Sequence, residues 1–405
     1  MWISFPRIRW CGLAAAGLLL SMAEPGWAQL PSSATGGRAE LSRLLVVGDS
    51  LSAGFQNFSL FDSDGVPSLP PGGQTHGYTA LVAQQAAVSL TLPIISYPGI
   101  PPALTLTPGG VIRAAGVGSR ENPTIQAHNL SVPGFTVLNA LAYPFPGSPL
   151  TNPIDALSDS ILGVPGNQPG CGPIPVGPNL YVSQVLCAAA LKPTTILVSI
   201  GNNDVLQALT FGIPPTNQTA FAEQYAALLA GLASTHARIV VSNIPDVTDI
   251  PFLVPVPAFE GLCGFTPADA GAADFVVVNI TNPTAVSFNI CVNYAVRSAA
   301  LVAQAKAAVV EYNRAIEAEA RLFGAVVVDV NSLLGGIAQN GYNVGGKHLT
   351  VAFLGGIFSL DGIHPTNTGY AILANATIAT MNQQLHTQIP LVSVAQVAAT
   401  DPLVP

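Results

Sequence analysis

Ser50, Asp361 and His364 are the residues of this sequence whose types and spacing predict acyl-transfer chemistry. Ser50 lies in the stretch GDSL (48–51), directly after an apolar run, and Asp361 and His364 lie three positions apart in DGIHP (361–365). A serine hydroxyl becomes a good nucleophile when a histidine takes its proton, and a carboxylate can fix the tautomer of that histidine. We therefore predict a catalytic triad made of these three residues.

Acyl transfer also needs hydrogen-bond donors that stabilise the negative charge developing on the carbonyl oxygen. Three candidates are the backbone N–H of Ser50, the backbone N–H of Gly134 in NLSVPG (129–134), and the side-chain amide of Asn203 in GNND (201–204). Glycine at position 134 would let the backbone approach a substrate closely. We expect these three donors to form the oxyanion hole.

Other polar residues near the motifs have structural interpretations. We expect Asp49 to be a turn residue and Asp204 to cap the helix that follows it. His128, beside a predicted strand end, is either a site residue or a structural histidine, and we favour the second interpretation. His76 and His348 receive no role.

Several motifs for other chemistries are missing from the sequence. The G-x-S-x-G elbow of the common α/β-hydrolases does not fit, because a serine, Ser52, stands two residues after Ser50. No G-x-G-x-x-G follows the first apolar run, which argues against a dinucleotide site, and neither CxxC nor HExxH occurs, which argues against zinc. We expect no cofactor and no metal.

The motifs must be positioned by an α/β fold. Short β-branched runs predict buried strands at 43–50, 124–132, 194–202, 237–245 and 324–331, with a weaker candidate at 90–97 that contains Pro93. Helical patterns lie between them, at 221–232, at roughly 293–322, and after Thr368. This alternation predicts a parallel sheet covered on both faces, with the motifs gathered at the carboxyl ends of the strands.

Composition bears on the domain organisation. Gly (39) and Pro (35) are abundant and concentrate at 98–123, 141–190 and 246–292, segments too long to be simple connections. No repeat or flexible linker divides the chain. We expect one domain over 41–390, with inserts near 141–190 and 246–292, and a C-terminal tail at 391–405.

The first 28 residues have the layout of a secretory signal peptide. Two arginines precede a short apolar run, and small residues follow near Ala28, which indicates cleavage and a secreted or periplasmic protein. An uncleaved anchor is the alternative, and no later apolar run predicts a membrane span. Net charge is −8 without a Lys/Arg cluster, so we expect no nucleic-acid partner.

Four cysteines follow the leader. An even number in an exported chain favours two disulfides, for which three connectivities are open. Proximity in the sequence favours Cys171–Cys187 and Cys263–Cys291.

The four blocks GDSL, NLSVPG, GNND and DGIHP, in this order, resemble those of the GDSL esterase/lipase family, also called SGNH hydrolases. The resemblance spans 44–370 and places the family's functional residues on Ser50, Gly134, Asn203, Asp361 and His364. It implies a three-layer α/β/α sandwich with a flavodoxin-like, mostly parallel five-stranded sheet, and a serine esterase with a small-molecule or lipid-like ester substrate. Oligomeric state does not follow from it.

Substrate class is the least determined feature of the sequence. Loops near the motifs contain apolar side chains with almost no Lys or Arg, which suits short- to medium-chain acyl or aryl esters. These residues are Phe55, Phe58, Phe61, Phe135, Phe252, Leu253, Phe353, Leu354 and Phe358. A carbohydrate O-acetylesterase and a catalytically inactive binding module on the same fold are the alternatives.

Overall fold

The computed structural model describes residues 41–405 except 67–68, 70, 146–151, 164–170 and 281–287. The predicted signal peptide at 1–28 lies outside the described residues. Within them, no helix is long and apolar enough to cross a membrane.

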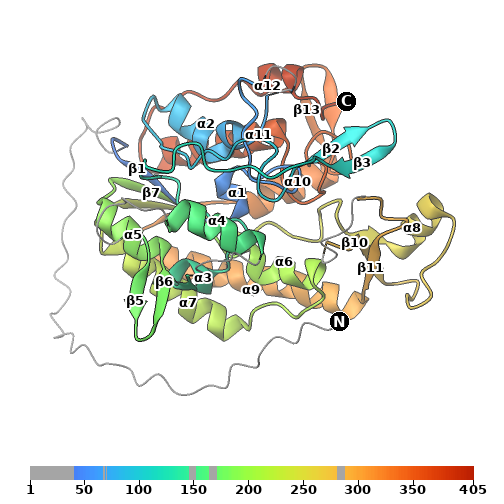
Figure 1. The fold of residues 1–405 in the computed structure, drawn as a ribbon, viewed down its shortest axis with the longest axis horizontal. Coiled ribbons are helices and arrows are strands. Elements are labelled where there is room, and N and C mark those ends of the chain that lie inside the picture. Colours follow the sequence, from blue (N-terminus) through green and yellow to red (C-terminus); the bar gives the residue numbers. More distant parts are fainter. Residues whose placement is uncertain (1–40, 67–68, 70, 146–151, 164–170, 281–287) are drawn as a thin grey trace. The chain divides into compact units, whose positions relative to one another are not determined.

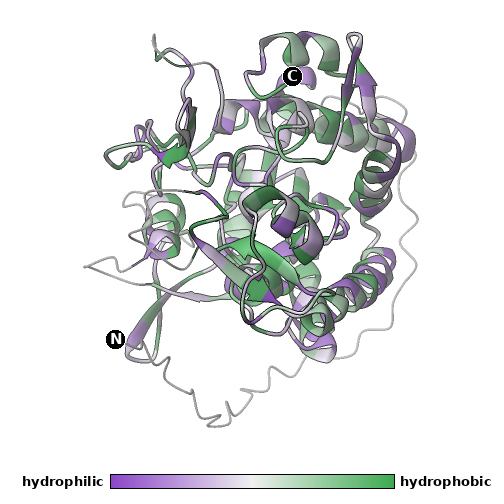
Figure 2. Ribbon diagram, turned by 90° about the vertical axis from the view of Figure 1, so that its right-hand side faces the viewer, coloured by the Kyte–Doolittle hydropathy of each residue, from purple (hydrophilic) through white to green (hydrophobic). Residues whose placement is uncertain are grey.

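A parallel four-stranded sheet forms the centre of the fold. Its strands are β1 (Leu44–Gly48), β7 (Thr195–Ser199), β8 (Arg238–Ser242) and β12 (Val326–Val328), in the spatial order β1-β7-β8-β12. All residues of β1 and β7 are buried, as their continuous apolar runs predict. The central strands are strongly hydrophobic, whereas the surrounding helices mix hydrophobic and hydrophilic residues (Figure 2).

The predicted strand at 124–132 occupies a fifth position without forming a regular strand. Its backbone pairs with β1 through a parallel bridge between Val46 and Asn129, and Leu130 N donates to Val46 O at 2.9 Å. Counting this segment, the order is that of a flavodoxin-like sheet. The weaker candidate at 90–97 contributes isolated bridges at Ile95 and Ser96 but no strand in the described structure.

Helices cover both faces of the sheet (Figure 1). One layer contains α3 (Val137–Leu141), α5 (Gln184–Leu191), α6 (Asn202–Thr210), α7 (Gln218–Ala233) and α9 (Ala299–Leu322). The other contains α2 (Tyr78–Gln85), α10 (Val330–Asn340), α11 (Asn367–Gln384) and α12 (Val394–Thr400). The result is a three-layer α/β/α sandwich.

Two helices show how well the sequence pattern predicted local structure. In α7, the expected stripe of Phe221, Tyr225, Leu228, Leu229 and Leu232 is buried. The predicted helix at 293–322 begins later, at Ala299, because Ser298 caps it and the preceding residues form β11 (Tyr294–Arg297).

The Pro/Gly-rich segments contain small elements of their own. Residues 98–123 include the hairpin β2 (Leu104–Thr107) and β3 (Gly110–Arg113). Around 141–190 lie α4 (Pro153–Leu162) and a sheet of β4 (Tyr143–Pro144), β6 (Asn179–Val182) and β5 (Ile174–Val176). Around 246–292 lie α8 (Val256–Cys263), β9 (Val254–Pro255) and β10 (Phe275–Val278), which pairs with β11.

Two disulfides join the cysteines in the pairing favoured by proximity, Cys171–Cys187 and Cys263–Cys291. Each closes a loop within one insert.

The segment at 391–405, expected to be a tail, forms α12 and packs against α11. Val392 and Val394 are buried, and Asp401 accepts hydrogen bonds from the backbone N and the hydroxyl of Thr368, both at 2.8 Å.

Candidate active site

Ser50 is positioned by a tight turn from strand to helix. β1 ends at Gly48, and Ser50 begins the four-residue helix α1 (Ser50–Ala53). Asp49 caps this helix, accepting a hydrogen bond from Leu51 N at 3.1 Å. A side chain at Gly48 would overlap the carbonyl oxygen of Ser199 on β7, so the turn requires glycine. The nucleophile candidate therefore lies at the carboxyl end of a central strand.

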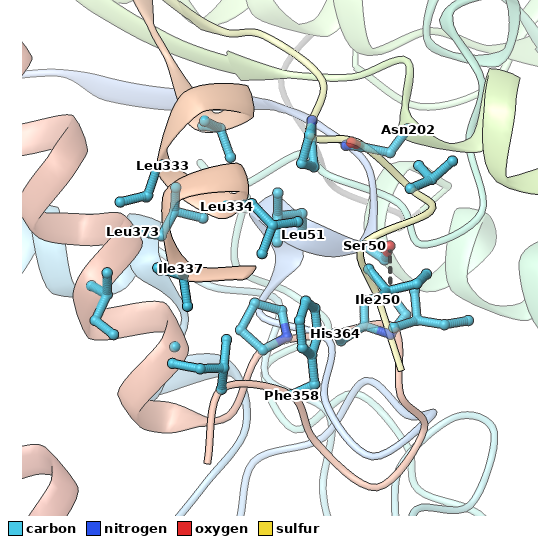
Figure 3. A pocket seen from close by; sticks show the side chains of 18 of the residues that line it. Ser50, Leu51, Asn202, Ile250, Leu333, Leu334, Ile337, Phe358, His364 and Leu373 are labelled. Carbon is cyan, nitrogen blue, oxygen red and sulfur yellow. Dashed lines mark hydrogen bonds between the residues drawn. The ribbon is translucent and has the colours of Figure 1, made fainter. Parts of the chain in front are cut away.

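A continuous hydrogen-bonded chain connects the three predicted triad residues. Ser50 Oγ lies 2.8 Å from His364 Nε2, and His364 Nδ1 lies 3.0 Å from Asp361 Oδ2 (Figure 3). A carboxylate only accepts hydrogen bonds, so Nδ1 carries the proton that points at Asp361. Nε2 is then free to accept from the Ser50 hydroxyl, which is the arrangement that a general base needs.

Asp361 is held as a buried anion. Burial by itself raises the pKa of this carboxyl, but attraction to His364 and hydrogen bonds from His364 and the Ile363 N–H outweigh it, so the pKa lies below its ordinary value. Oδ1 accepts from the backbone N–H groups of Ile363 and His364, both at 2.8 Å, and Oδ2 accepts from Phe58 N at 2.6 Å. This carboxylate can stabilise a positively charged His364.

The segment that contains Gly134 lies near the end of β1, and the Asn203 side chain contacts the next residue, Phe135. Val132 N donates to Gly48 O at 3.1 Å, which brings the 132–134 segment alongside the strand that leads to Ser50. Asn203, in the first turn of α6, donates from Nδ2 to Phe135 O at 2.9 Å. Gly134 has φ +88°, a left-handed conformation that favours glycine.

The predicted oxyanion donors keep capacity for a substrate oxygen. In the described part of the chain, neither the Ser50 N–H nor the Gly134 N–H donates to another group. The Asn203 amide has a second N–H besides the one that it gives to Phe135.

Asn202 is a site residue that the sequence analysis missed. Its Nδ2 donates to Asp49 Oδ2 at 2.9 Å, which joins the start of α6 to the start of α1. Asp49 is fully buried, and burial raises its pKa to about 6 although the Asn202 and Leu51 hydrogen bonds oppose the shift. Asn202 stands directly before Asn203 after the end of β7, and this position in the sequence was the signal that could have identified it.

The expectation that Asp204 caps its own helix is wrong, because Gly201 occupies the N-cap position of α6. Asp204 instead accepts from Val137 N at 2.9 Å and from the Thr216 hydroxyl at 2.8 Å. Burial raises its pKa to about 6. Its carboxylate thus ties α6 to the start of α3, just after Gly134.

Three other histidines, His76, His128 and His348, make contacts outside this hydrogen-bonded chain. His128 is half-buried, and burial lowers its pKa. His76 pairs with Asp64 at 3.0 Å, and His348 lies 2.8 Å from the Asn343 side-chain oxygen. Among the described residues, no group of three or more His, Cys, Asp or Glu side chains could hold a metal ion.

A pocket opens beside Ser50 and His364 and has a cavity volume of about 100 Å³. Its lining is apolar apart from Ser50, Asn202 and His364. The apolar residues come mainly from α10 and α11 and from the loops around 245–250 and 357–365: Val330, Leu333, Leu334, Ile337, Ile372, Leu373, Val247, Ile250, Ile357, Phe358 and Ile363. An apolar wall was expected, but Phe358 is the one member of the predicted aromatic and aliphatic set that lines this pocket. Phe353 and Leu354 are exposed.

The family model described as GDSL-like Lipase/Acylhydrolase matches residues 44–377, which include all four motif blocks. The chain belongs to this family. As a member of the GDSL-like family, it is a hydrolase that acts on ester bonds.

Three solved structures are among those to which this chain is similar. LAE5, an alpha/beta hydrolase enzyme from the metagenome of Lake Arreo, Spain, has a TM-score of 0.38 and 14% sequence identity, and the match covers 84% of this chain and 95% of LAE5. Axe2, an acetylxylan esterase from Geobacillus stearothermophilus, has a TM-score of 0.37 and 14% identity, with 84% of this chain and 94% of Axe2 covered. TesA has a TM-score of 0.35 and 14% identity, with 84% of this chain and 98% of TesA covered. At these identities the likenesses say nothing of the substrate. A comparison with curated protein sequences gives no match.

Proposed function

We propose that this GDSL-like hydrolase is a secreted or periplasmic serine esterase that cleaves short- to medium-chain acyl or aryl esters through Ser50, His364 and Asp361. The observation that carries the proposal is the unbroken hydrogen-bonded chain from Asp361 through His364 to Ser50. An inactive binding module would be expected to lack at least one residue of this hydrogen-bonded series. The two disulfides and the signal-like leader support export.

In this mechanism, His364 Nε2 takes the Ser50 proton while Oγ attacks the ester carbonyl carbon. The charged His364 is stabilised by Asp361, and the oxyanion accepts hydrogen bonds from Ser50 N, Gly134 N and Asn203 Nδ2. The tetrahedral intermediate collapses, the bond to the alcohol oxygen breaks, and His364 returns the proton to the alcohol. Water, activated by His364, then attacks the acyl-enzyme and releases the acid with Ser50 restored.

The triad is tested by two substitutions. Ser50→Ala and His364→Ala should each abolish hydrolysis of 4-nitrophenyl butyrate. Ser50→Ala should change thermal unfolding little because it leaves no large cavity, whereas His364→Ala also removes a partner of the buried Asp361 carboxylate and should lower stability. A fluorophosphonate should label the unmodified protein at Ser50, as located by peptide mass spectrometry. A fully active Ser50→Ala variant would disprove the assignment.

The substrate class is tested separately from the triad. The apolar pocket can bury more apolar surface of a butyryl or octanoyl group than of the acetyl group of an acetylated sugar. We expect kcat/KM for butyrate or octanoate esters to exceed that for acetylated xylan. The opposite preference would identify a carbohydrate O-acetylesterase and leave the triad intact.

A further inference from the structure

The pocket beside Ser50 bears on which esters the proposed hydrolase prefers. We propose that it binds the acyl chain of the ester, rather than the alcohol, and that Ile337 on α10 limits the length of that chain. This inference rests on the proposed function, since it takes Ser50 as the residue that becomes acylated.

The composition of the lining identifies the ligand class. The three polar side chains, Ser50, His364 and Asn202, belong to the catalytic end, and the Asn202 amide is already engaged by Asp49. No Lys, Arg, Asp or Glu from the described part of the chain lines the pocket. An acyl chain is polar at its carbonyl and apolar beyond it, which matches this division, whereas a sugar or glycerol would find few partners for its hydroxyls.

The order of events favours the acyl side over the alcohol side. The alcohol leaves after the first step, but the acyl chain stays bonded to Ser50 until water attacks. A recessed apolar pocket that opens at Ser50 keeps this chain away from solvent during the interval. Its volume of about 100 Å³ is several times the roughly 10–15 Å³ that one water molecule requires.

The wall opposite the catalytic pair is formed by α10 and α11. Figure 3 shows Leu333, Ile337 and Leu373 across the pocket from Ser50. Ile337 and Leu373 are buried, at 7% and 5% exposure. Gln339, two positions further along α10, is exposed and does not line the pocket. Ile337 and Gln339 therefore offer a matched pair of positions on one helix.

The experiment compares chain-length profiles. kcat/KM is measured for 4-nitrophenyl acetate, butyrate and octanoate with the unmodified protein, Ile337→Phe, Ile337→Ala and the control Gln339→Phe. Ile337→Phe should lower the ratio of kcat/KM for octanoate to kcat/KM for acetate at least about tenfold, because one methylene too many in a filled hydrophobic pocket changes kcat/KM by about that factor. Ile337→Ala should shift the optimum to longer chains, and Gln339→Phe should leave the ratio unchanged.

A second series separates the acyl side from the alcohol side. Acetate esters of ethanol, butanol and octanol share one acyl group, so Ile337→Phe should not change their relative kcat/KM. An altered alcohol profile with an unaltered acyl profile would overturn the assignment to the acyl chain. An unchanged acyl profile in both Ile337 variants would overturn the role of α10, while hydrolysis that depends on Ser50 would still support the proposed function.

Calorimetric binding of octanoate to the Ser50→Ala protein tests the pocket without turnover. Adding Ile337→Phe should weaken this binding about tenfold, and adding Gln339→Phe should not. Equal binding in the two double variants would refute the pocket even if the enzyme proved inactive on every ester.

Discussion

The Asp49–Asn202 hydrogen bond leads to a pH-dependent prediction about stability. Asp49 has no exposed surface, and its carboxylate accepts from Asn202 Nδ2 at 2.9 Å and from Leu51 N at 3.1 Å. Asn202→Ala would remove one of these two donors. The buried Asp49 carboxylate, where it is charged, would then have one hydrogen-bond donor fewer.

The magnitude follows from the pKa. Burial raises the pKa of Asp49 from 3.8 to about 6. At roughly 1.4 kcal/mol per unit, the charged form costs about 3 kcal/mol of stability above pH 6. A hydrogen bond to a charged group contributes about 1.5–3 kcal/mol, so Asn202→Ala should add a loss of that size where Asp49 is ionised.

Whether folding stability rises or falls with pH depends on whether the folded or the unfolded state binds more protons. Between pH 4 and 6 the folded protein holds the Asp49 proton more tightly than the unfolded chain does, so its contribution to stability falls as pH rises through this window. At pH 4 the folded Asp49 carboxyl is neutral, and the Asn202 hydrogen bond is worth about 1 kcal/mol. The loss from Asn202→Ala should therefore shrink as pH falls.

Urea unfolding of the unmodified protein and Asn202→Ala at pH 8 and pH 4 measures this difference. Asp204 also has a raised pKa, but it is present in both proteins and cancels from the comparison. Asp49→Asn serves as a control, because Asn202→Ala added to it should cost the same at both pH values. An equal loss at the two pH values in the presence of Asp49 would refute the ionised carboxylate as the cause.

Two further predictions concern the oxyanion hole. Asn203→Ala should lower kcat by about 10²–10³ with little change in KM, as loss of one oxyanion donor does in another hydrolase, and a change confined to KM would make Asn203 a ground-state contact. Gly134→Ala should also lower kcat, because φ is +88° and the added Cβ would lie 2.8 Å from Ile154 Cδ1. If steric contact alone were responsible, adding Ile154→Ala would restore the rate, whereas we expect the strained backbone to keep it low.

The hydrogen-bonded arrangement of Ser50, His364 and Asp361 could be predicted because local sequence determines much of its geometry. Asp361 and His364 share one tight turn, in which Asp361 Oδ1 accepts from the backbone N–H groups of Ile363 and His364. Ser50 follows a strand whose apolar run is unmistakable, and parallel strands bring their carboxyl ends together. The helical stripe of α7 was predictable for a similar reason, since its period is a property of the chain itself.

Partners far apart in the sequence could not be predicted. Asp204 sits in the first turn of its helix, where a capping role is common, yet its backbone partner Val137 is 67 positions away. The edge segment at 124–132 has the composition of a strand, but it pairs with β1 around a single bridge. In both cases tertiary contacts outweighed the local preference.

The pocket wall shows why substrate specificity was harder to locate than chemistry. Phe353 and Leu354 are close to the DGIHP motif in sequence but are exposed, whereas Leu334 and Ile337, further away, line the pocket from α10. Nothing in the motif specifies how that helix packs. Because Asp361 is held by Phe58, Ile363 and His364, none of them on α10, the helix can change the shape of the pocket without altering these contacts. Substitutions on α10 should therefore alter the preference among ester substrates more strongly than they alter the ability to cleave esters at all.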